Sequence, residues 1–359
     1  MAGVTAGLLG IAHPHALAHL RTLQALPEVE RIVLWDQDDR ALSAARQATD
    51  HKIARHDTDL DALLRQGEPH FVLVCVPTNE APAICLRALR AGAHVLAEKP
   101  IGRSAAEVEQ VVAAAEQARL QLGVCYQNRY HPVMREARAI VGQGLIGPLV
   151  AVEIRLLTTQ VRFRDPASWL FQRQLAGGGV LAWLGCHDLD LMRYITQDEI
   201  VSVSAEVATR SGEAIDVEDV AVLALRFRSG ALGSLHIAYT LALHGGGYHN
   251  LAGYDTHTCF HGRAGRVTWS HGDARLHVES TDRSWAAAPT RDLSFTLPTS
   301  SSYGGVHGEA FVRDFIRSTY TGDPPPAAGR DALQVARIID AAYTSSQSGR
   351  RVDVAPPER

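Results

Sequence analysis

Residues 70–100 of the sequence, HFVLVCVPTNEAPAICLRALRAGAHVLAEKP, decide the expected fold. The run HFVLVCVPT is apolar almost throughout, which is typical of a strand buried on both faces of a parallel sheet. The segment EAPAICLRALRAG predicts a helix that ends at Gly92, and AHVLAEKP predicts another buried strand. A strand, a helix and a strand in this order predict a parallel βαβ unit.

The same alternation extends over the first third of the chain. Apolar strands are expected at 3–11, 30–38 and 120–127, with helices at 14–26, 39–49, 58–67 and 104–119. Ser104 and Glu107 form the sequence pattern of a capping box, which marks the start of the last of these helices. Residues 1–125 therefore predict an α/β domain with a doubly wound parallel sheet of the Rossmann type.

The pattern changes after residue 125. A helix is expected at 131–144, and segments of alternating apolar and polar residues follow at 149–161, 200–210, 219–240 and 257–270. This period of two predicts a largely antiparallel sheet, and two helices, 304–322 and 329–349, complete the pattern. Because 359 residues exceed what a single core usually organises, we expect two abutting domains, 1–125 and 126–359, with a ligand cleft between them.

Composition narrows the class of protein. The chain is 46% apolar and 21% charged, as ordinary globular enzymes are. A formal charge of −4 offers no basic surface to phosphate backbones or anionic lipids, which disfavours nucleic-acid and membrane partners and favours a small-molecule ligand. The five cysteines form no C-x-x-C pair, and the start of the chain lacks a basic signal-peptide region. We therefore predict a cytoplasmic protein.

Lysine usage singles out one residue. Among the 35 basic residues, only Lys52 and Lys99 are lysines. An ammonium group can release its proton and a guanidinium group cannot, so a retained lysine is a candidate for acid/base chemistry. Lys52 lies in a polar stretch and is interpreted as a surface charge. Lys99 follows Glu98 at the carboxyl end of a predicted strand, where a partly desolvated amine could exchange a proton with a substrate hydroxyl.

The first predicted strand and its turn indicate a dinucleotide site, because the following helix offers free N-terminal amides to a pyrophosphate. The glycine fingerprint is incomplete: Gly10 matches, whereas Ala12 and His15 occupy the other two glycine positions. His13 and His15 either donate to phosphate or cap the turn. Asp36 ends the second strand, where a carboxylate can bind the ribose hydroxyls and repel a 2′-phosphate. The sequence thus favours NAD over NADP.

Another polar cluster follows the third strand at the same edge of the sheet. Pro77, Thr78 and Asn79 are placed where ligands of doubly wound folds bind, and a plain turn is the alternative interpretation.

The segment GGGVLAWLGCHDLD, residues 177–190, carries the densest set of acid/base side chains. His187 is open to three interpretations: a metal ligand, an acid/base group or a structural histidine. No H-x-x-x-H or C-x-x-C partner lies nearby, which disfavours zinc, so no metal site is predicted. Asp188 is expected to be solvated, and Gly177–Gly179 are interpreted as a flexible approach to the cleft.

Taken together, these segments resemble a known family. VCVPTN, AGAHVLAEKPIG, YQNRYHP, GLIGPLVAVEI, GGGVLAWLGCHDLDLMRYIT, DVEDVAVLALRFRSGALG and GRDALQVARIIDAAYTSSQSGRRVDV look, in this order, like the Gfo/Idh/MocA oxidoreductases, named for glucose-fructose oxidoreductase and inositol dehydrogenase. The likeness implies a Rossmann domain and a C-terminal α/β domain with an open, mostly antiparallel sheet. It also implies NAD(P)-dependent oxidation or reduction at a secondary hydroxyl of a sugar, cyclitol or related polyol, in homodimers or homotetramers assembled through that sheet.

The resemblance also implies roles for individual positions. The lysine of the E-K-P motif falls on Lys99, and His187 would bind the reacting hydroxyl as an acid/base group supported by Asp190. The inositol dehydrogenase pattern has an aspartate four residues before the histidine, where this chain has Trp183, and Pro82 replaces the usual histidine after the third strand. The missing aspartate shifts the expected acid/base role toward Lys99.

The complete set of predicted contacts follows from the turn, the strand ends and the family motifs. The predicted cofactor contacts are Gly10, Ala12, His13, His15, Asp36, Pro77, Thr78, Asn79, Glu98, Lys99 and Gln127. The predicted substrate contacts are Lys99, Tyr126, Arg129, Trp169, Trp183, His187 and Asp190. Tyr126 and Trp169 either stack on a sugar or nicotinamide ring or fill the core.

The leading hypothesis is reversible hydride transfer between NAD and a carbon that bears a secondary alcohol. Two alternatives stay open. One is an enzyme that keeps NAD bound and cleaves a glycosidic bond through transient oxidation, with no net redox change. The other is a non-catalytic protein that senses nucleotides, which the missing aspartate permits.

Overall fold

The chain divides into two compact units in a computed structural model that describes residues 3–11, 13–47, 52–243, 245, 250–270, 272 and 274–356. The first unit contains residues 1–130 and 298–333, and the second contains residues 131–297 and 334–359. The first boundary, at 130, lies five residues beyond the expected one at 125. The return of residues 298–333 to the first unit differs from the linear division into 1–125 and 126–359.

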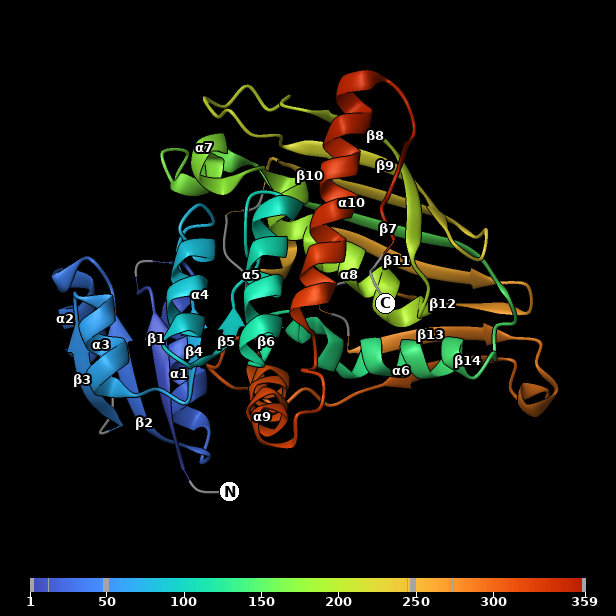
Figure 1. Cartoon of the computed structure of the whole chain (residues 1–359). Coiled ribbons are helices and arrows are strands. Elements are labelled where there is room, and N and C mark those ends of the chain that lie inside the picture. Colours follow the sequence, from blue (N-terminus) through green and yellow to red (C-terminus); the bar gives the residue numbers. More distant parts are fainter. Residues whose placement is uncertain are drawn as a thin grey trace. The chain divides into compact units, whose positions relative to one another are not determined.

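The first unit is built on a six-stranded parallel sheet (Figure 1) with the strand order β3-β2-β1-β4-β5-β6. Its strands are β1 (Val4–Leu9), β2 (Val29–Trp35), β3 (Ile53–Asp57), β4 (Phe71–Val74), β5 (His94–Ala97) and β6 (Leu122–Val124). Its helices are α1 (Ala16–Ala25), α2 (Asp39–Gln47), α3 (Leu60–Gly67), α4 (Ala81–Arg90) and α5 (Ala105–Ala118). The predicted doubly wound sheet is confirmed.

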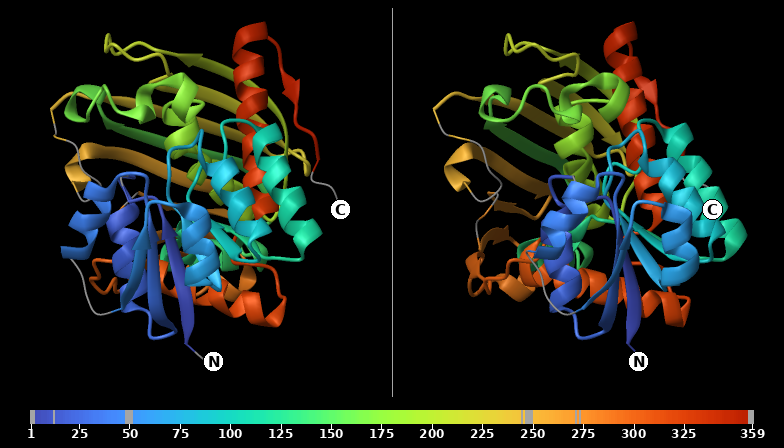
Figure 2. Two further views of the ribbon diagram at one scale, coloured as in Figure 1. Left: turned by 60° about the vertical axis from the view of Figure 1, so that its left-hand side comes forward. Right: turned by 90° about the vertical axis from the view of Figure 1, so that its left-hand side faces the viewer.

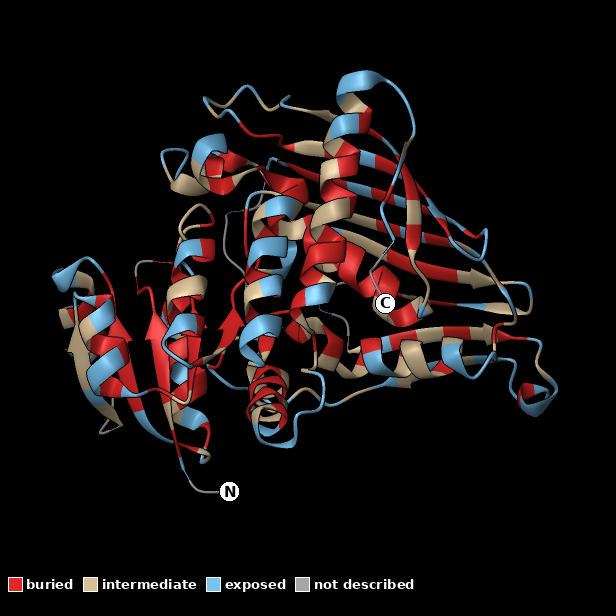
Figure 3. Cartoon of the chain, viewed as in Figure 1, coloured by how far each residue is buried: buried red, intermediate tan, exposed pale blue. Residues whose placement is uncertain are grey.

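Central strands of this sheet are buried along their length, as their apolar sequences predict. All four residues of β4 are buried, and Figure 3 shows that the neighbouring strands β1 and β5 are buried over most of their length. At the start of α5, the Ser104 hydroxyl accepts a hydrogen bond from the Glu107 amide, as the capping box predicts. The Glu107 carboxylate accepts from the amide of Arg103, one residue before the usual partner.

One strand of the sheet has no apolar signal in the sequence. β3 reads IARHD and pairs with β2 alone, at the edge of the sheet, with its residues half-buried or exposed. An edge strand needs no continuous apolar run because one side of it is not covered by a neighbour.

Residues 298–333 close the first unit from a distant part of the sequence. The helix α9 (Gly305–Thr321) packs beside α1 and beside the short 3-10 helix η1 (Gln127–Tyr130). The amide of Tyr303 donates to the Thr22 hydroxyl at 2.9 Å, and Arg129 forms an ion pair with Asp331 at 3.1 Å. These contacts link the segment to the rest of the first unit across 281 and 202 residues of sequence.

The second unit contains a nine-stranded sheet in the order β14-β13-β12-β11-β7-β10-β9-β8-β15. Its strands are β7 (Leu149–Thr159), β8 (Ile200–Ala208), β9 (Val220–Phe227), β10 (Leu232–Leu241), β11 (Tyr254–Gly262), β12 (Gly265–Trp269), β13 (Arg275–Ser280), β14 (Thr290–Ser294) and β15 (Val352–Asp353). Among the residues that the structure describes, only β7 and β10 pair in parallel in this sheet, so the predicted, mostly antiparallel sheet is confirmed. The sequence patterns do not predict the strands β13, β14 and β15.

Two helices of the second unit pack against one face of this sheet (Figure 2): α6 (Pro132–Gly142) and α8 (Cys186–Thr196). Alternate residues of β9 face this layer and are buried, namely Ala221, Leu223, Leu225 and Phe227. The last long helix is α10 (Gly329–Ser348). No helix in the described ranges is both long enough and apolar enough to cross a membrane.

Candidate functional site

The turn after β1 has the geometry of a phosphate-binding turn at its first glycine. Gly10 has a φ of 102°, and a Cβ added there would lie 2.2 Å from the carbonyl oxygen of Cys75. Glycine is therefore required at this position, both for the backbone conformation and for the close approach to the residue after β4. Helix α1 then begins at Ala16, with His15 at its N-cap. Ala12 lies outside the described residues.

Asp36 connects the end of β2 to the same turn. One carboxylate oxygen accepts the amide of Ile11 at 2.6 Å, and the other accepts the amide of Asp38 at 2.8 Å. Each carboxylate oxygen has a second lone pair, so these bonds orient Asp36 and leave it able to accept from ribose hydroxyls.

The ends of three adjacent strands carry the other predicted cofactor residues. Asn79 follows β4, Lys99 follows β5 and Gln127 follows β6. The side-chain oxygens of Asn79 and Gln127 are buried and have no hydrogen-bond partner within the part of the chain that the structure describes. Buried polar atoms are normally satisfied, so these two oxygens fit a bound group that donates hydrogen bonds. The carboxamide and ribose hydroxyls of NAD are such donors.

A buried cluster surrounds Glu98, directly before Lys99. The Glu98 carboxylate accepts hydrogen bonds from His19 Nε2 at 2.6 Å, from His15 Nδ1 at 3.1 Å and from the backbone amide of Lys99 at 2.9 Å. Burial by itself would raise the pKa of Glu98, but the interactions with His15 and His19 outweigh it and hold that pKa well below its usual range. Glu98 is therefore an anion, although it is 3% exposed.

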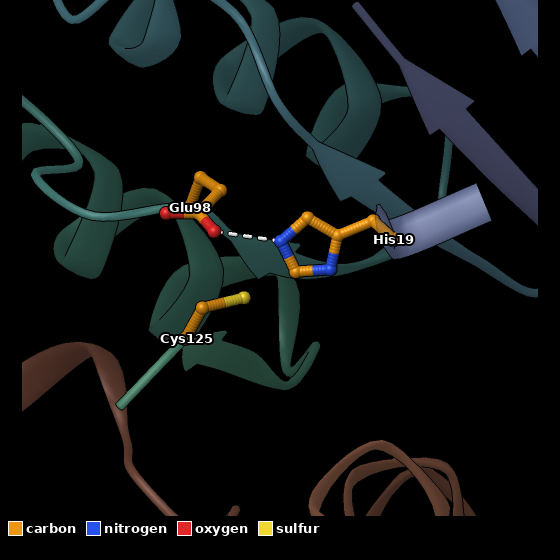
Figure 4. A group of neighbouring side chains, drawn as sticks. All are labelled: His19, Glu98 and Cys125. Atoms are coloured by element: carbon orange, nitrogen blue, oxygen red, sulfur yellow. Dashed lines mark hydrogen bonds and ion pairs between the residues drawn. The ribbon is translucent and has the colours of Figure 1, made fainter. Parts of the chain in front are cut away.

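His19 and Glu98 of this cluster, together with the neighbouring Cys125, are side chains of the types that bind metal ions. Figure 4 shows His19, Glu98 and Cys125 pointing toward one another, and their ligand atoms all lie within 4.8 Å of each other. Tetrahedral zinc with bonds of about 2.0–2.1 Å would keep nitrogen and oxygen ligands about 3.3 Å apart. The 2.6 Å separation of His19 Nε2 and Glu98 Oε1 is instead that of a hydrogen bond. We interpret the group as a hydrogen-bonded network.

Tyr126 and Arg129 lie in the structural framework of the first unit. Tyr126 is buried at 2% exposure, in line with the core interpretation. Arg129 donates to the Asp331 carboxylate in the first turn of α10 and to the carbonyl of Pro326, which anchors the start of this helix and the segment before it.

In the second unit, Gly178 and Gly179 pack closely against their neighbours, so the interpretation as a flexible approach is wrong for these two glycines. A Cβ at Gly178 would lie 1.9 Å from the hydroxyl of Tyr343, and a Cβ at Gly179 would lie 1.9 Å from the carbonyl oxygen of Glu218. Gly177 has a φ of 82°. Gly178 and Gly179 are needed because other groups occupy the space that side chains would fill, and the positive φ of Gly177 is a conformation that favours glycine.

Glu218 holds the segment that follows these glycines. One of its carboxylate oxygens accepts the amide of Leu181 at 3.1 Å and the hydroxyl of Tyr343 at 2.8 Å, and its carbonyl accepts the amide of Val180 at 3.0 Å. Burial raises the pKa of Glu218. Neither Glu218 nor Tyr343 is among the site residues predicted from the sequence, although both lie in motifs that carried the family resemblance.

His187 and Trp183 follow on a helix with an irregular start. Residues Leu181–Gly185 form a π-helical turn, η4, that continues into α8. Trp183 is buried and packs edge-to-face on Trp169, with ring centroids 5.7 Å apart. The indole that replaces the family's aspartate is thus part of an aromatic pair. His187 is half-buried and Asp190 is buried, both on α8.

Asp188 is buried, so the expectation that it would be solvated is wrong. It is 7% exposed, and its Oδ2 atom has no hydrogen-bond partner in the described ranges. Burial raises its pKa to about 7. The sequence of α8 alone could not show which of its residues are covered, because α8 packs against α6, a helix about 50 residues earlier in the chain.

Comparison with known proteins agrees with this architecture. Residues 4–126 match the model of the oxidoreductase family with an NAD-binding Rossmann fold, and residues 134–268 match the GFO/IDH/MocA C-terminal domain. The chain belongs to the Gfo/Idh/MocA oxidoreductase family. It is thus an NAD-dependent oxidoreductase that acts on CH–OH groups, as the sequence predicts.

Its relatives within the family are distant in sequence and cover nearly the whole chain. A levoglucosan dehydrogenase from Pseudarthrobacter phenanthrenivorans is 24% identical over 97% of this chain and 96% of its own. A myo-inositol 2-dehydrogenase from Thermotoga maritima is 26% identical over 88% and 91%.

Solved structures show the same fold. An oxidoreductase domain protein from Kribbella flavida superposes with a TM-score of 0.88 at 26% identity, covering 99% of this chain and all of that one. A levoglucosan dehydrogenase in complex with NADH and levoglucosan superposes with a TM-score of 0.86 at 22% identity, over 99% of this chain and all of its own.

Proposed function

We propose that this oxidoreductase transfers a hydride between NAD and a secondary CH–OH carbon of a sugar, cyclitol or related polyol. Relatives named as dehydrogenases of levoglucosan, myo-inositol and D-apiose support this substrate class. The observation that carries the proposal lies within the first unit. Lys99 follows β5, which lies between β4 and β6 in the sheet. Asn79 follows β4 and Gln127 follows β6, and their buried side-chain oxygens fit a bound group that donates hydrogen bonds.

The cofactor contacts follow from the turn and the strand ends. We infer that NAD is held by Gly10, Ala12, His13, His15, Asp36, Pro77, Thr78, Asn79, Glu98, Lys99 and Gln127. NAD supplies the hydride acceptor in this chemistry. Asp36 favours NAD over NADP because its carboxylate repels a 2′-phosphate.

Lys99 and His187 are proposed as the acid/base groups. When the carbon of a secondary alcohol loses a hydride, the hydroxyl oxygen must lose its proton. An amine or imidazole held beside that oxygen accepts the proton. No carboxylate stands at position 183, so the larger share of this role falls to Lys99, whose backbone is fixed by the Glu98 carboxylate. Substrate contacts are proposed for Tyr126, Arg129, Trp169, Trp183 and Asp190.

A panel of sugars and polyols, followed at 340 nm with NAD and with NADP, tests the proposed activity. Replacing Lys99 by Met is expected to lower kcat by about 10²–10⁴-fold, the usual contribution of a general acid or base. Lys52→Met is the matched control, because Lys52 is the other lysine and its ammonium binds the carbonyls of Gln24 and Leu26. Turnover that is unchanged in Lys99→Met would contradict the assignment.

The same panel separates the two alternatives. Glycoside cleavage without net NADH formation would favour an enzyme that retains NAD and oxidises transiently. NAD binding without turnover of any polyol would favour a nucleotide sensor.

A homodimer or homotetramer is proposed through the outward face of the nine-stranded sheet. Val150, Val222 and Leu232 are large apolar residues of this sheet that are about half exposed. Burying such side chains between subunits would remove apolar surface from water. A cytoplasmic location stays a prediction, and the five cysteines, all buried free thiols, are compatible with it.

A further inference from the structure

The helix that carries His187 begins without a capping side chain of its own. Helical hydrogen bonding starts at Gly179, whose carbonyl accepts the amide of Trp183 at 2.8 Å. Val180 is the N-cap of the π-helical turn η4, and its apolar side chain cannot accept a hydrogen bond. The first amides of a helix have no acceptor inside the helix, so they need one from another part of the chain.

Glu218 supplies that acceptor from the segment before β9. Its carbonyl oxygen accepts the Val180 amide at 3.0 Å, and its Oε1 atom accepts the Leu181 amide at 3.1 Å. Gly179 allows this approach, because a Cβ there would lie 1.9 Å from the same carbonyl oxygen. The backbone and the side chain of one residue thus cap two successive amides, which fixes both the position and the rotation of the first helical turn.

The carboxyl group of Glu218 is itself held in place by two other elements of the second unit. Glu218 is 1% exposed, and its Oε1 atom also accepts the hydroxyl of Tyr343 on α10 at 2.8 Å. The guanidinium of Arg173 approaches Oε2 at 4.0 Å. Arg173 is the first residue of α7 (Arg173–Ala176), which comes shortly after the 3-10 helix η3 (Trp169–Phe171). The helix is therefore anchored to a point that α7 and α10 fix from outside it.

A helix transmits the geometry of its first turn to the residues that follow. Each residue of a helix advances about 1.5 Å along a rigid rod, so a shift or rotation at Leu181 also moves His187, six residues later. The turn between them, Leu181–Gly185, is π-helical, a rare geometry that is frequent at functional sites. Because a misplacement of about 1 Å can lower a catalysed rate about 100-fold, the capping contacts bear on catalysis as well as on stability.

We propose that Glu218 is a positioning residue, which sets the place of His187 in the site by capping the start of its helix. The inference rests on the proposed acid/base role of His187. It assigns Glu218 no contact with substrate or cofactor. Loss of the Glu218 side chain should therefore lower kcat and leave the binding of NAD, which is proposed for the first unit, unchanged.

The first test measures kcat, KM and the Kd for NAD of full-length variants, with the best substrate of the sugar and polyol panel. In Glu218→Ala we expect kcat to fall by about 10- to 100-fold while the Kd for NAD stays that of the wild type. In Glu218→Gln the amide oxygen can accept the bonds from Leu181 and Tyr343, so kcat should return close to the wild-type value.

Asp219 provides the matched control, because it is the neighbouring residue and also a buried carboxylate. Its two oxygens accept the amides of Arg210 at 2.8 Å and of Ser211 at 2.7 Å, which belong to a loop and not to the helix of His187. Asp219→Ala thus removes the acceptor of two buried bonds, as Glu218→Ala does. It should lose stability in urea and keep its kcat.

Circular dichroism gives a second measurement that needs no substrate. The edge-to-face pair of Trp169 and Trp183 should give an exciton signal, identified as the part of the spectrum that Trp169→Phe removes. Trp183 lies on the capped turn, so the signal should change in Glu218→Ala and persist in Glu218→Gln and in Asp219→Ala.

Wild-type kcat or an unchanged exciton signal in Glu218→Ala would overturn the inference, as would an equal loss of kcat in Asp219→Ala. If Glu218→Ala does not fold, Glu218→Asp takes its place in both measurements, because it keeps a carboxylate that is one methylene too short to reach the helix. A wild-type chain that turns over no polyol would instead contradict the proposed function, and the dichroism would still decide whether Glu218 positions the helix.

Discussion

Replacing Asp188 by Asn is expected to change how stability depends on pH. Burial raises the pKa of Asp188 from its ordinary value of 3.8 to about 7 in the folded protein. Below pH 3.8 both folded and unfolded chains hold the proton, and the residue makes no difference. As the pH rises further, the unfolded chain releases the proton first, so the folded state loses stability until about pH 7.

The magnitude follows from the same two values. About 1.4 kcal/mol per pH unit over this interval gives a penalty of about 4 kcal/mol above pH 7, of which about 2–3 kcal/mol develops between pH 5 and pH 8. The amide introduced by Asp188→Asn cannot titrate, so the variant should gain about 2–3 kcal/mol relative to wild type over that range.

Urea unfolding at pH 5, 6, 7 and 8, followed by tryptophan fluorescence and by circular dichroism, measures this difference. Comparing how it changes with pH removes the constant cost of placing an amide in the same site. Asp323→Asn is the control, because Asp323 is exposed, and its curve should run parallel to wild type. A gap between wild type and Asp188→Asn that stays constant from pH 5 to pH 8 would refute the reasoning.

Further changes test other parts of the molecule. Gly179→Ala should destabilise the protein by about 1–3 kcal/mol through overpacking, because the added Cβ would lie 1.9 Å from the Glu218 carbonyl oxygen. Gly245→Ala is the control, because a Cβ there would meet no atom within 4 Å, and equal melting curves for the two variants would contradict the prediction. Glu218→Ala should cost about 2–5 kcal/mol because two donors lose their acceptor, and Glu218→Gln, which keeps an acceptor oxygen, should cost much less in the same urea titration. Asp36→Ser should weaken the preference for NAD over NADP, measured as a ratio of Kd values, by about tenfold; an unchanged ratio would remove Asp36 from the ribose site. Leu232→Lys should shift the chain toward monomer in sedimentation if the outward sheet face is the interface, and an unchanged mass would exclude this residue from it.

The sequence predicted the first unit well because its signals are local. Apolar runs such as HFVLVCVPT mark central strands, and Gly92 ends its helix with a φ of 85° as expected. The strand β3 escaped prediction because an edge strand has weaker burial and a polar sequence. β14 escaped for the same reason, because it lies at the edge of the nine-stranded sheet and its residues are exposed or half-buried. β13 lies inside the sheet and buries alternate residues, but its six residues include two apolar ones, Leu276 and Val278, which is too short a pattern to stand out.

The candidate site was predicted in part. Asn79, Lys99 and Gln127 could be assigned to one edge because parallel strands end together. The cluster around Glu98 could be found only in part in this way. His19, which lies four residues after His15, was an available signal, whereas Tyr303, on which both histidine rings pack, comes from almost 300 residues further along the chain.

By itself, the sequence determined the family, the two sheets and the NAD-binding character of the first unit, because these depend on patterns within short segments. Only the tertiary structure decided that Gly178 and Gly179 leave room for Tyr343 and Glu218, that Asp188 is buried, and that residues 298–333 return to the first unit. The physical reason is the same in each case. Burial and close packing depend on which distant segment covers a residue, and periodicity in one segment shows which face is covered without showing what covers it.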